Sequence, residues 1–324
     1  MTQLFNVAVQ RAITNNLSLD VAYVGTLGHN LSYQIGNINA NPYDGTNKYN
    51  NRITPYLGTI QYLSDYGSVS YNSMQVKLQK RESRNLSFLL SYTYSHNLDN
   101  GPAPFNLGHI NNDEPQDPYN LHAEWASSDS DVRHNFVFSG LWALPFGRGQ
   151  KFGSDWGRVT NGVLGGWQIN SIYSMRTGSP VNVVRGNNPT SVLPGLRPDL
   201  VGNPVIPRTQ RTLLKYFNTD AFTSEPFNCS TPTSVTCNAP GDAGRNILYG
   251  PGWINLDSSL FKTFQFTERY SLQLRLELFN TLNTPHFANP QGNEGTMSNF
   301  GEITNQTGGQ EANRVAQIAG KFYF

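Results

Sequence analysis

Residues 270–279, YSLQLRLELF, alternate strictly between apolar and polar side chains, and this pattern decides the fold. The apolar positions are Tyr270, Leu272, Leu274, Leu276 and Leu278, and the polar positions between them are Ser271, Gln273, Arg275 and Glu277. Side chains of a β-strand point alternately to the two faces of a sheet, so a period of two predicts a strand with one apolar and one wet face. A helix would require apolar spacings of three and four.

The same alternation recurs along the chain. It is present near residues 5–10, 17–23, 73–78, 86–94, 136–142, 167–175, 254–260 and 316–324. Together with residues 270–279 these segments make nine strands and predict an all-β protein.

Composition excludes several classes of protein. The 324 residues include 23 Lys and Arg against 22 Asp and Glu, and only 14% of residues are charged, against about 25% in soluble domains. The net charge of +1 gives no basic face for nucleic acid, so no nucleic-acid partner is expected. No apolar run approaches the roughly 18 residues of a membrane-spanning helix.

The predicted connections alternate between short and long. Short turns fall near residues 14–16, 81–85 and 265–269, with an intermediate one at 145–166, and long loops at 25–68, 96–131, 178–252 and 284–312. Short periplasmic turns opposite long extracellular loops are typical of an antiparallel transmembrane β-barrel. The alternative is a soluble β-sandwich, whose apolar face packs inward.

Charge and aromatic placement favour the barrel. The polar faces of the strands carry candidate lumen-facing charges, which are Asp20, Lys77, Arg133, Asp257, Arg275 and Glu277. Basic residues interrupt the apolar face at short-turn ends, at Arg11, Lys80 and Lys262, where long side chains can reach an interface. Aromatic residues gather toward strand ends, as in the two girdles of a membrane barrel.

No cofactor or metal site is expected. The acidic segment Asn111–Gln116 lacks the residue order of a calcium loop. His134 lies near Asp131 and several serines in sequence, which is the best candidate for a hydrolase. Neighbours in sequence do not make a catalytic geometry, so an outer-membrane hydrolase is the least favoured function.

Several blocks of sequence carry a resemblance to a known family. They are SYNSMQVKLQKR at 70–81, LSFLLSYTYSHNLDN at 86–100, QDPYNLHAEWASSDSDVRHNFVFSGLWALPFGRG at 116–149, NGVLGGWQINSIYSMRTGSPVNV at 161–183, PGWINLDSSLFKTFQFTERYSLQLRLELFNTLNTPHFANP at 251–290 and RVAQIAGKFYF at 314–324. The chain resembles the C-terminal β-barrel portion of TonB-dependent outer-membrane receptors, in the Oar-like group with a carboxypeptidase-regulatory-like domain. Its last residues, Phe322, Tyr323 and Phe324, resemble the signal read by the barrel assembly machinery, although an ordinary edge strand would also end this way.

The resemblance implies a fragment in the bacterial outer membrane. Such receptors have about 22 strands, an inner plug and a segment that contacts TonB, whereas this chain has nine predicted strands. Residues 1–324 would then be the C-terminal barrel part, reaching the TonB system only through parts that it lacks. Nine antiparallel strands cannot close with every pair antiparallel, and single-chain bacterial barrels have even numbers. Whether Met1 is the true start stays open.

In an intact relative the barrel would take up a nutrient that its surface loops capture. Candidate loop contacts are the aromatic residues Tyr43, Tyr56, Tyr62 and Phe217. The ligand, small or oligomeric, is not specified by the sequence. A soluble all-β carbohydrate-binding module is the alternative function.

The two cysteines generate a prediction. Cys229 and Cys237 frame the polar stretch CSTPTSVTC, whose spacing suits a small disulfide loop in an oxidising compartment, two free thiols being the alternative. We expect a disulfide in the mature protein. Mass spectrometry after alkylation without reduction should leave both residues unmodified, and alkylation of both would contradict the bond.

Overall fold

The computed structural model describes residues 1–42, 52–83, 85–101, 115–185, 195–223, 240–295, 298–307 and 313–324. Tyr43, Cys229 and Cys237 lie outside these residues, so the disulfide and the Tyr43 contact stay predictions. Within the described residues, no helix is long and apolar enough to cross a membrane.

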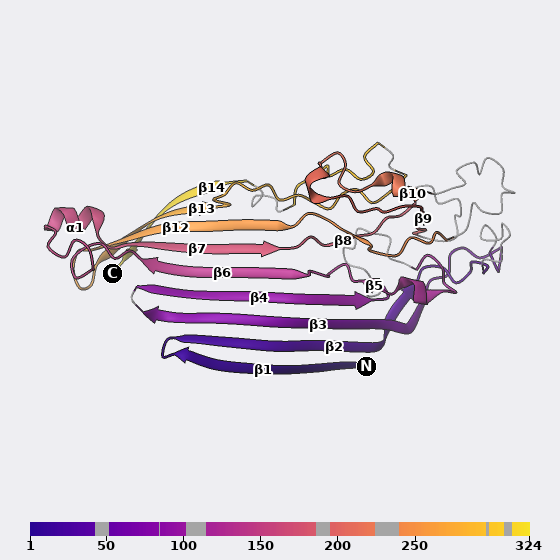
Figure 1. Ribbon diagram of the computed structural model, residues 1–324, viewed down its shortest axis with the longest axis horizontal. Coiled ribbons are helices and arrows are strands. Elements are labelled where there is room, and N and C mark those ends of the chain that lie inside the picture. Colours follow the sequence, from indigo (N-terminus) through magenta and orange to yellow (C-terminus); the bar gives the residue numbers. More distant parts are fainter. Residues whose placement is uncertain are drawn as a thin grey trace.

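One large antiparallel sheet organises the molecule (Figure 1). Its nine long strands lie in chain order: β1 (Thr2–Thr14), β2 (Leu17–Ile35), β3 (Tyr62–Ser83), β4 (Leu86–Asp99), β6 (His134–Ala143), β7 (Trp167–Arg176), β12 (Trp253–Gln265), β13 (Ser271–Phe279) and β14 (Val315–Tyr323). The two-residue strand β5 (Ala126–Ser127) also pairs with β4. The nine predicted strands are confirmed, and the sheet is open, with β1 and β14 at its edges.

All short turns lie at one end of the sheet and all long connections at the other (Figure 1). The turn between β6 and β7 contains a short helix, α1 (Arg158–Leu164). The C-terminus lies at the short-turn end and the N-terminus at the loop end. This is the predicted arrangement of periplasmic turns and extracellular loops.

The strands extend further into the loops than the alternation predicts. β2 continues to Ile35 and β3 begins at Tyr62, so the loop expected at 25–68 is confined to residues 36–61. Tyr62 is therefore a strand residue rather than a loop residue. Two register shifts, between Gly28 and Tyr33, interrupt this extension. The alternation is broken at these shifts, where Asn30 has a positive φ, and the pairing continues beyond them to the buried side chains of Tyr33 and Ile35.

The register tests the predicted faces, because antiparallel partners project to the same side. Asp20 pairs with Lys77, and their charged atoms lie 4.0 Å apart. On β13, Arg275 Nη1 lies 3.9 Å from Glu277 Oε1. Glu277 pairs with Ser259, which lies two positions after Asp257 and therefore on the same face of β12. Following the pairing across the sheet places five charged residues on one face: Asp20, Lys77, Asp257, Arg275 and Glu277.

The opposite face is apolar and has no protein layer over it in the described residues. One row of successive partners across six strands is Leu19, Leu78, Leu90, Phe138, Tyr173 and Leu256. At the edge, Ile318 is 81% exposed. A soluble sandwich would bury this face against a second sheet. The apolar side of this sheet therefore faces outward, toward lipid.

Aromatic rows bound this outward face at both ends. Near the loops, the rings of Tyr94 and His134 lie 5.1 Å apart. Near the turns, Trp142 is exposed, and Tyr270 stacks on Phe322 with ring centroids 6.1 Å apart. His134 and Trp142 are eight residues apart on β6, roughly 26 Å along a strand at about 3.3 Å per residue. A tilt of about 40° reduces this to roughly 20 Å, close to the apolar band of a membrane barrel.

Adjacent leucines on β4 provide a test of the two faces. Leu90 lies on the outward face, and Leu89 projects to the polar face beside Gln79 and Ser139. Leu90→Arg should destabilise the lipid-embedded sheet by about 2–4 kcal/mol, because it places a charge in hydrocarbon. Leu89→Arg should cost less than about 1 kcal/mol, and urea unfolding in lipid measures both. Equal losses would contradict the assignment of faces.

Candidate functional site

A folded layer of connecting segments lies beyond the loop end of the sheet (Figure 1). It contains the small strand pairs β8 (Pro180–Val181) with β11 (Leu248–Tyr249) and β9 (Asp199–Leu200) with β10 (Phe222–Thr223). It also contains the 3-10 helices η2 (Leu121–Glu124), η3 (Arg208–Gln210) and η4 (Thr219–Ala221). We call this the loop layer, residues 36–42, 52–61, 115–133, 177–185, 195–223, 240–252 and 280–307 as far as they are described.

An aromatic cluster forms the apolar centre of the loop layer. Phe217 packs edge-on against Phe222 and Phe300, with ring centroids 5.8 and 5.3 Å away. Val183 and Leu248 belong to the same buried cluster. Phe217 is only 2% exposed, so its predicted role as a ligand contact is wrong. An apolar ring in a polar segment gains more free energy by packing against other apolar residues than by remaining in water.

Buried ion pairs hold segments of the loop layer together and join the layer to the sheet. Arg197 Nη1 donates to Glu124 Oε2 over 2.6 Å, and both side chains are almost fully buried. Arg245 donates to the Asp99 carboxylate at the end of β4 and, over 3.0 Å, to the Glu124 carbonyl. Gln116 adds a hydrogen bond to the Gly241 carbonyl over 3.0 Å. Such fully paired buried charges favour one arrangement of the segments that they connect, because any shift leaves a charge unpaired.

A second polar centre surrounds Asp131, whose side chain is completely buried. Its carboxylate accepts hydrogen bonds from the Asn97 amide over 2.8 Å and from the Tyr249 hydroxyl over 2.9 Å. Arg133 lies 3.4 Å from the same carboxylate and also donates to Tyr249 over 3.3 Å. Arg133 lies directly before β6 and anchors a loop there, and its lumen-facing position stays a prediction.

The possible hydrolase residues do not form a catalytic arrangement. The imidazole Nδ1 of His134 is hydrogen-bonded to the Tyr92 hydroxyl over 2.9 Å, on the outward face of the sheet. Asp131 instead contacts His96, at 3.4 Å. Among the described residues, no group of three His, Cys, Asp or Glu side chains is placed to hold a metal ion.

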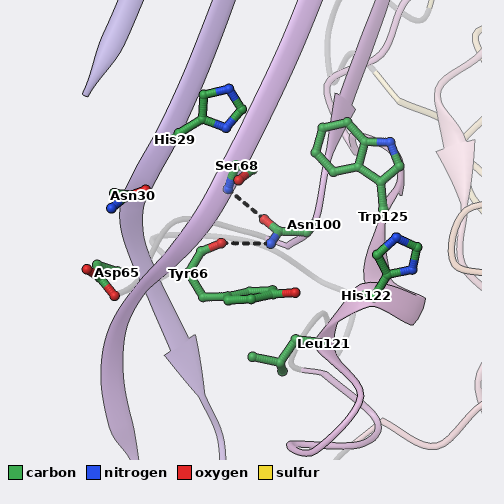
Figure 2. Close-up of a pocket in the computed structure, with 9 residues that line it drawn as sticks. All are labelled: His29, Asn30, Asp65, Tyr66, Ser68, Asn100, Leu121, His122 and Trp125. Carbon is green, nitrogen blue, oxygen red and sulfur yellow. Dashed lines mark hydrogen bonds between the residues drawn. The ribbon is translucent and has the colours of Figure 1, made fainter.

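A pocket of about 530 Å³ opens where β2, β3 and β4 meet the loop layer (Figure 2). Its lining residues are His29, Asn30, Asp65, Tyr66, Ser68, Asn100, Leu121, His122 and Trp125. A buried asparagine builds one wall of it. Asn100 Oδ1 accepts from the Ser68 amide over 2.8 Å, and Asn100 Nδ2 donates to the Tyr66 carbonyl over 2.9 Å.

The η2 segment supplies the opposite wall of the pocket. Trp125, which directly follows η2, projects toward the strand residues in Figure 2, and His122 lies beside it. Tyr119 helps hold this segment, because its hydroxyl donates to the Ala40 carbonyl over 2.8 Å. Burial raises the pKa of Tyr119, and the nearby Asp117 carboxylate raises it further. The hydroxyl therefore stays protonated and able to donate across the neutral pH range.

The pocket combines exposed aromatic rings with polar groups. Tyr66 and Trp125 are both exposed, and Asp65 is the one Asp, Glu, Lys or Arg among the described lining residues. Of the predicted loop aromatics, Tyr56 is 98% exposed and, like Tyr62, lies outside this lining. Sequence reasoning missed His122 and Trp125, because their segment has no periodic pattern and its position depends on distant contacts.

Comparison with known proteins gives the same picture of the sheet. The family described as "Outer membrane beta barrel domain" matches residues 1–317. The outer membrane transporter YddB from Escherichia coli is similar with a TM-score of 0.50 and 10% identity, over 99% of this chain and 32% of that chain. The siderophore receptor PiuA from Acinetobacter baumannii has a TM-score of 0.47 and 9% identity, over 99% and 28%. No curated protein matches the chain.

The first of these likenesses concerns the fold, since identity is only 10%. The chain spans about a third of the length of each of these solved structures.

The buried ion pair yields a prediction for the loop layer. Glu124→Ala leaves Arg197 buried without its partner, which should destabilise the layer by about 3–5 kcal/mol. Hydrogen exchange should then be faster in residues 195–200 and 240–249. Asp220→Ala is the matched control, because Asp220 pairs with Lys215 at 3.7 Å on the exposed surface and should cost less than about 1 kcal/mol. Similar exchange in both variants would refute the role of the buried pair.

Proposed function

The chain belongs to the outer membrane beta barrel domain family, and on that premise we propose that it forms part of the wall of a TonB-dependent receptor that takes up a nutrient. Its place is the bacterial outer membrane. The observation that carries the proposal is the two-faced sheet, with an apolar outward face, a charged inner face and a ligand-sized pocket at its extracellular end. The fold of an outer membrane transporter, YddB, supports it.

The open edges of the sheet support a larger barrel. β1 is exposed along its whole length, and β14 is exposed at all but one residue. Their free backbone groups have no water to bind in hydrocarbon, so a stable wall requires further strands on both edges. We propose that residues 1–324 are the C-terminal part of the complete barrel, and that a plug and TonB contact are provided by other parts of that receptor.

The lining of the pocket favours a hydroxyl-rich ligand without strong negative charge. The described lining contains Asp65 but neither lysine nor arginine, which an anionic ligand would need for pairing. The exposed rings of Tyr66 and Trp125 offer flat apolar surfaces beside the side chains of Asn30 and His122. Oligosaccharides present just this combination of apolar ring faces and hydroxyl groups. We therefore propose an oligosaccharide as the captured ligand.

Binding to the purified full chain tests the pocket. Calorimetric titration with maltoheptaose and with chitohexaose should show saturable binding of at least one. Trp125→Ala should weaken it about ten- to hundredfold, as expected for losing one large buried contact. Tyr56→Ala removes an exposed aromatic side chain outside the pocket and should change affinity less than twofold. Equal losses, or no binding of either sugar, would contradict the oligosaccharide site.

Uptake by cells tests transport itself. The probe is a fluorescent derivative of whichever sugar, maltoheptaose or chitohexaose, binds the purified chain. In cells with the intact receptor gene, deleting the region that encodes residues 1–324 should abolish accumulation of this probe. A protonophore should stop accumulation in wild-type cells while leaving surface binding intact, because only the transport step requires energy. Accumulation that persists with the protonophore would contradict a TonB-dependent receptor.

A further inference from the structure

The turn between β6 and β7 is unlike the other connections at the periplasmic end. It spans residues 144–166 and contains α1, whereas the turns after β1, β3 and β12 are a few residues long. We call residues 144–166 the helical turn. It presents large apolar side chains to solvent: Val159 is 81% exposed and Val163 is 60% exposed. Leu164, Phe146 and Phe152 are also exposed.

The helical turn is fixed to the outward side of the sheet. Lys262 lies on the apolar face of β12, where it pairs with Trp167. Its ammonium group donates to the carbonyls of Val163, over 3.2 Å, and of Gly165. The indole of Trp167 donates to the same Val163 carbonyl over 2.9 Å. The C-terminal end of α1 is therefore held by two side chains of the lipid-facing surface.

Coverage by the helical turn explains a buried cation on an apolar face. Lys262 is only 3% exposed, and its ammonium lies 5.0 Å from the ring centre of Trp167 and 5.2 Å from that of Phe264. Carbonyl acceptors and aromatic faces together compensate the lost hydration of the charge. Because Lys262 fastens α1 beside the aromatic row, the exposed valines lie level with the membrane interface.

Hydrogen bonds within the helical turn make this surface rigid. The segment 145–153 closes on itself through bonds from Phe152 to Pro145 and from Gly147 to Phe152, over 3.0 and 2.8 Å. Asn161 on α1 accepts from the Arg148 amide over 2.7 Å. The apolar surface is therefore preorganised, and its exposure is not a property of a loose segment.

The charges of the helical turn are mostly basic. Arg148, Lys151 and Arg158 are exposed, against one acid, Asp155. Arg11 and Lys80 extend the basic groups along the outward face at the same end of the sheet. Exposed apolar side chains flanked by cations are the composition of segments that lie in the interface of an anionic membrane.

We propose that the helical turn is a membrane-interface anchor that binds anionic phospholipid of the periplasmic leaflet. The valines and Leu164 enter the acyl boundary, and Lys151 and Arg158 contact the lipid phosphate groups. The surface continues the lipid-facing side of the sheet, which selects lipid over a periplasmic protein as its occupant. This assignment rests on the membrane location and does not depend on transport or on the sugar pocket.

Lipid titration of the full chain in neutral detergent tests the charges. The probes are fluorescent phosphatidylglycerol and, for binding without net lipid charge, fluorescent phosphatidylcholine. Lys151→Gln with Arg158→Gln should weaken phosphatidylglycerol binding about tenfold or more. The matched control, Arg208→Gln with Lys215→Gln, removes the same two residue types from the exposed loop layer and should change binding less than twofold. Equal effects in both variants, or equal binding of both lipids by the wild type, would overturn the anchor.

A second pair of variants tests the apolar part on the same helix. Val159→Gln should weaken binding of both lipids several-fold, because it removes acyl contact. Thr160→Gln changes a neighbouring exposed residue on α1 and should leave binding unchanged. Circular dichroism should show the same strand content in every variant, since all altered side chains are exposed. If Val159→Gln binds both lipids like the wild type, the helix does not enter the membrane and the proposal fails.

Discussion

Backbone hydrogen bonding in a medium without water is the constraint on which the rest of this structure depends. In hydrocarbon each unpaired amide or carbonyl costs several kcal/mol, so a sheet must pair every strand with a neighbour. All eight junctions between the nine long strands are antiparallel and keep their register over most of their length. With pairing satisfied inside the sheet, side chains on the outward face need only be apolar, and those on the inner face are free to carry charge.

This constraint explains which features were predictable from the sequence. A period of two is a local signal, so the nine strands and their faces follow from residues such as Leu272 and Arg275 without knowledge of their neighbours. Turn length is local as well. The extension of β2 to Ile35 was missed because the register shifts after Gly28 interrupt the alternation, although Tyr33 and Ile35 beyond them are buried.

The pocket and the loop layer were not predictable, because contacts between distant residues build them. Glu124 and Arg197 are 73 residues apart in the chain, and Asp99 and Arg245 are 146 apart. In its local sequence, each of these charged residues is indistinguishable from a solvated loop residue. Phe217 failed as a ligand contact for the same reason, since a loop aromatic is exposed or buried according to the partners that fold over it. Trp125 stays at the pocket because the buried Glu124 of η2, held by Arg197 and Arg245, fixes the segment that carries it.

The two ends of the sheet use the same kinds of side chain in opposite ways. At the loop end, charged residues such as Arg197 are buried and paired, which gives the extracellular segments a fixed shape in water without a large apolar core. At the turn end, Val159 and Val163 are exposed although a buried lysine and internal hydrogen bonds hold their helix in place. Exposing a rigid apolar surface to water costs free energy in proportion to its area. That cost disappears if the surface lies against lipid, and the basic residues around it match the phosphate layer that lipid would present.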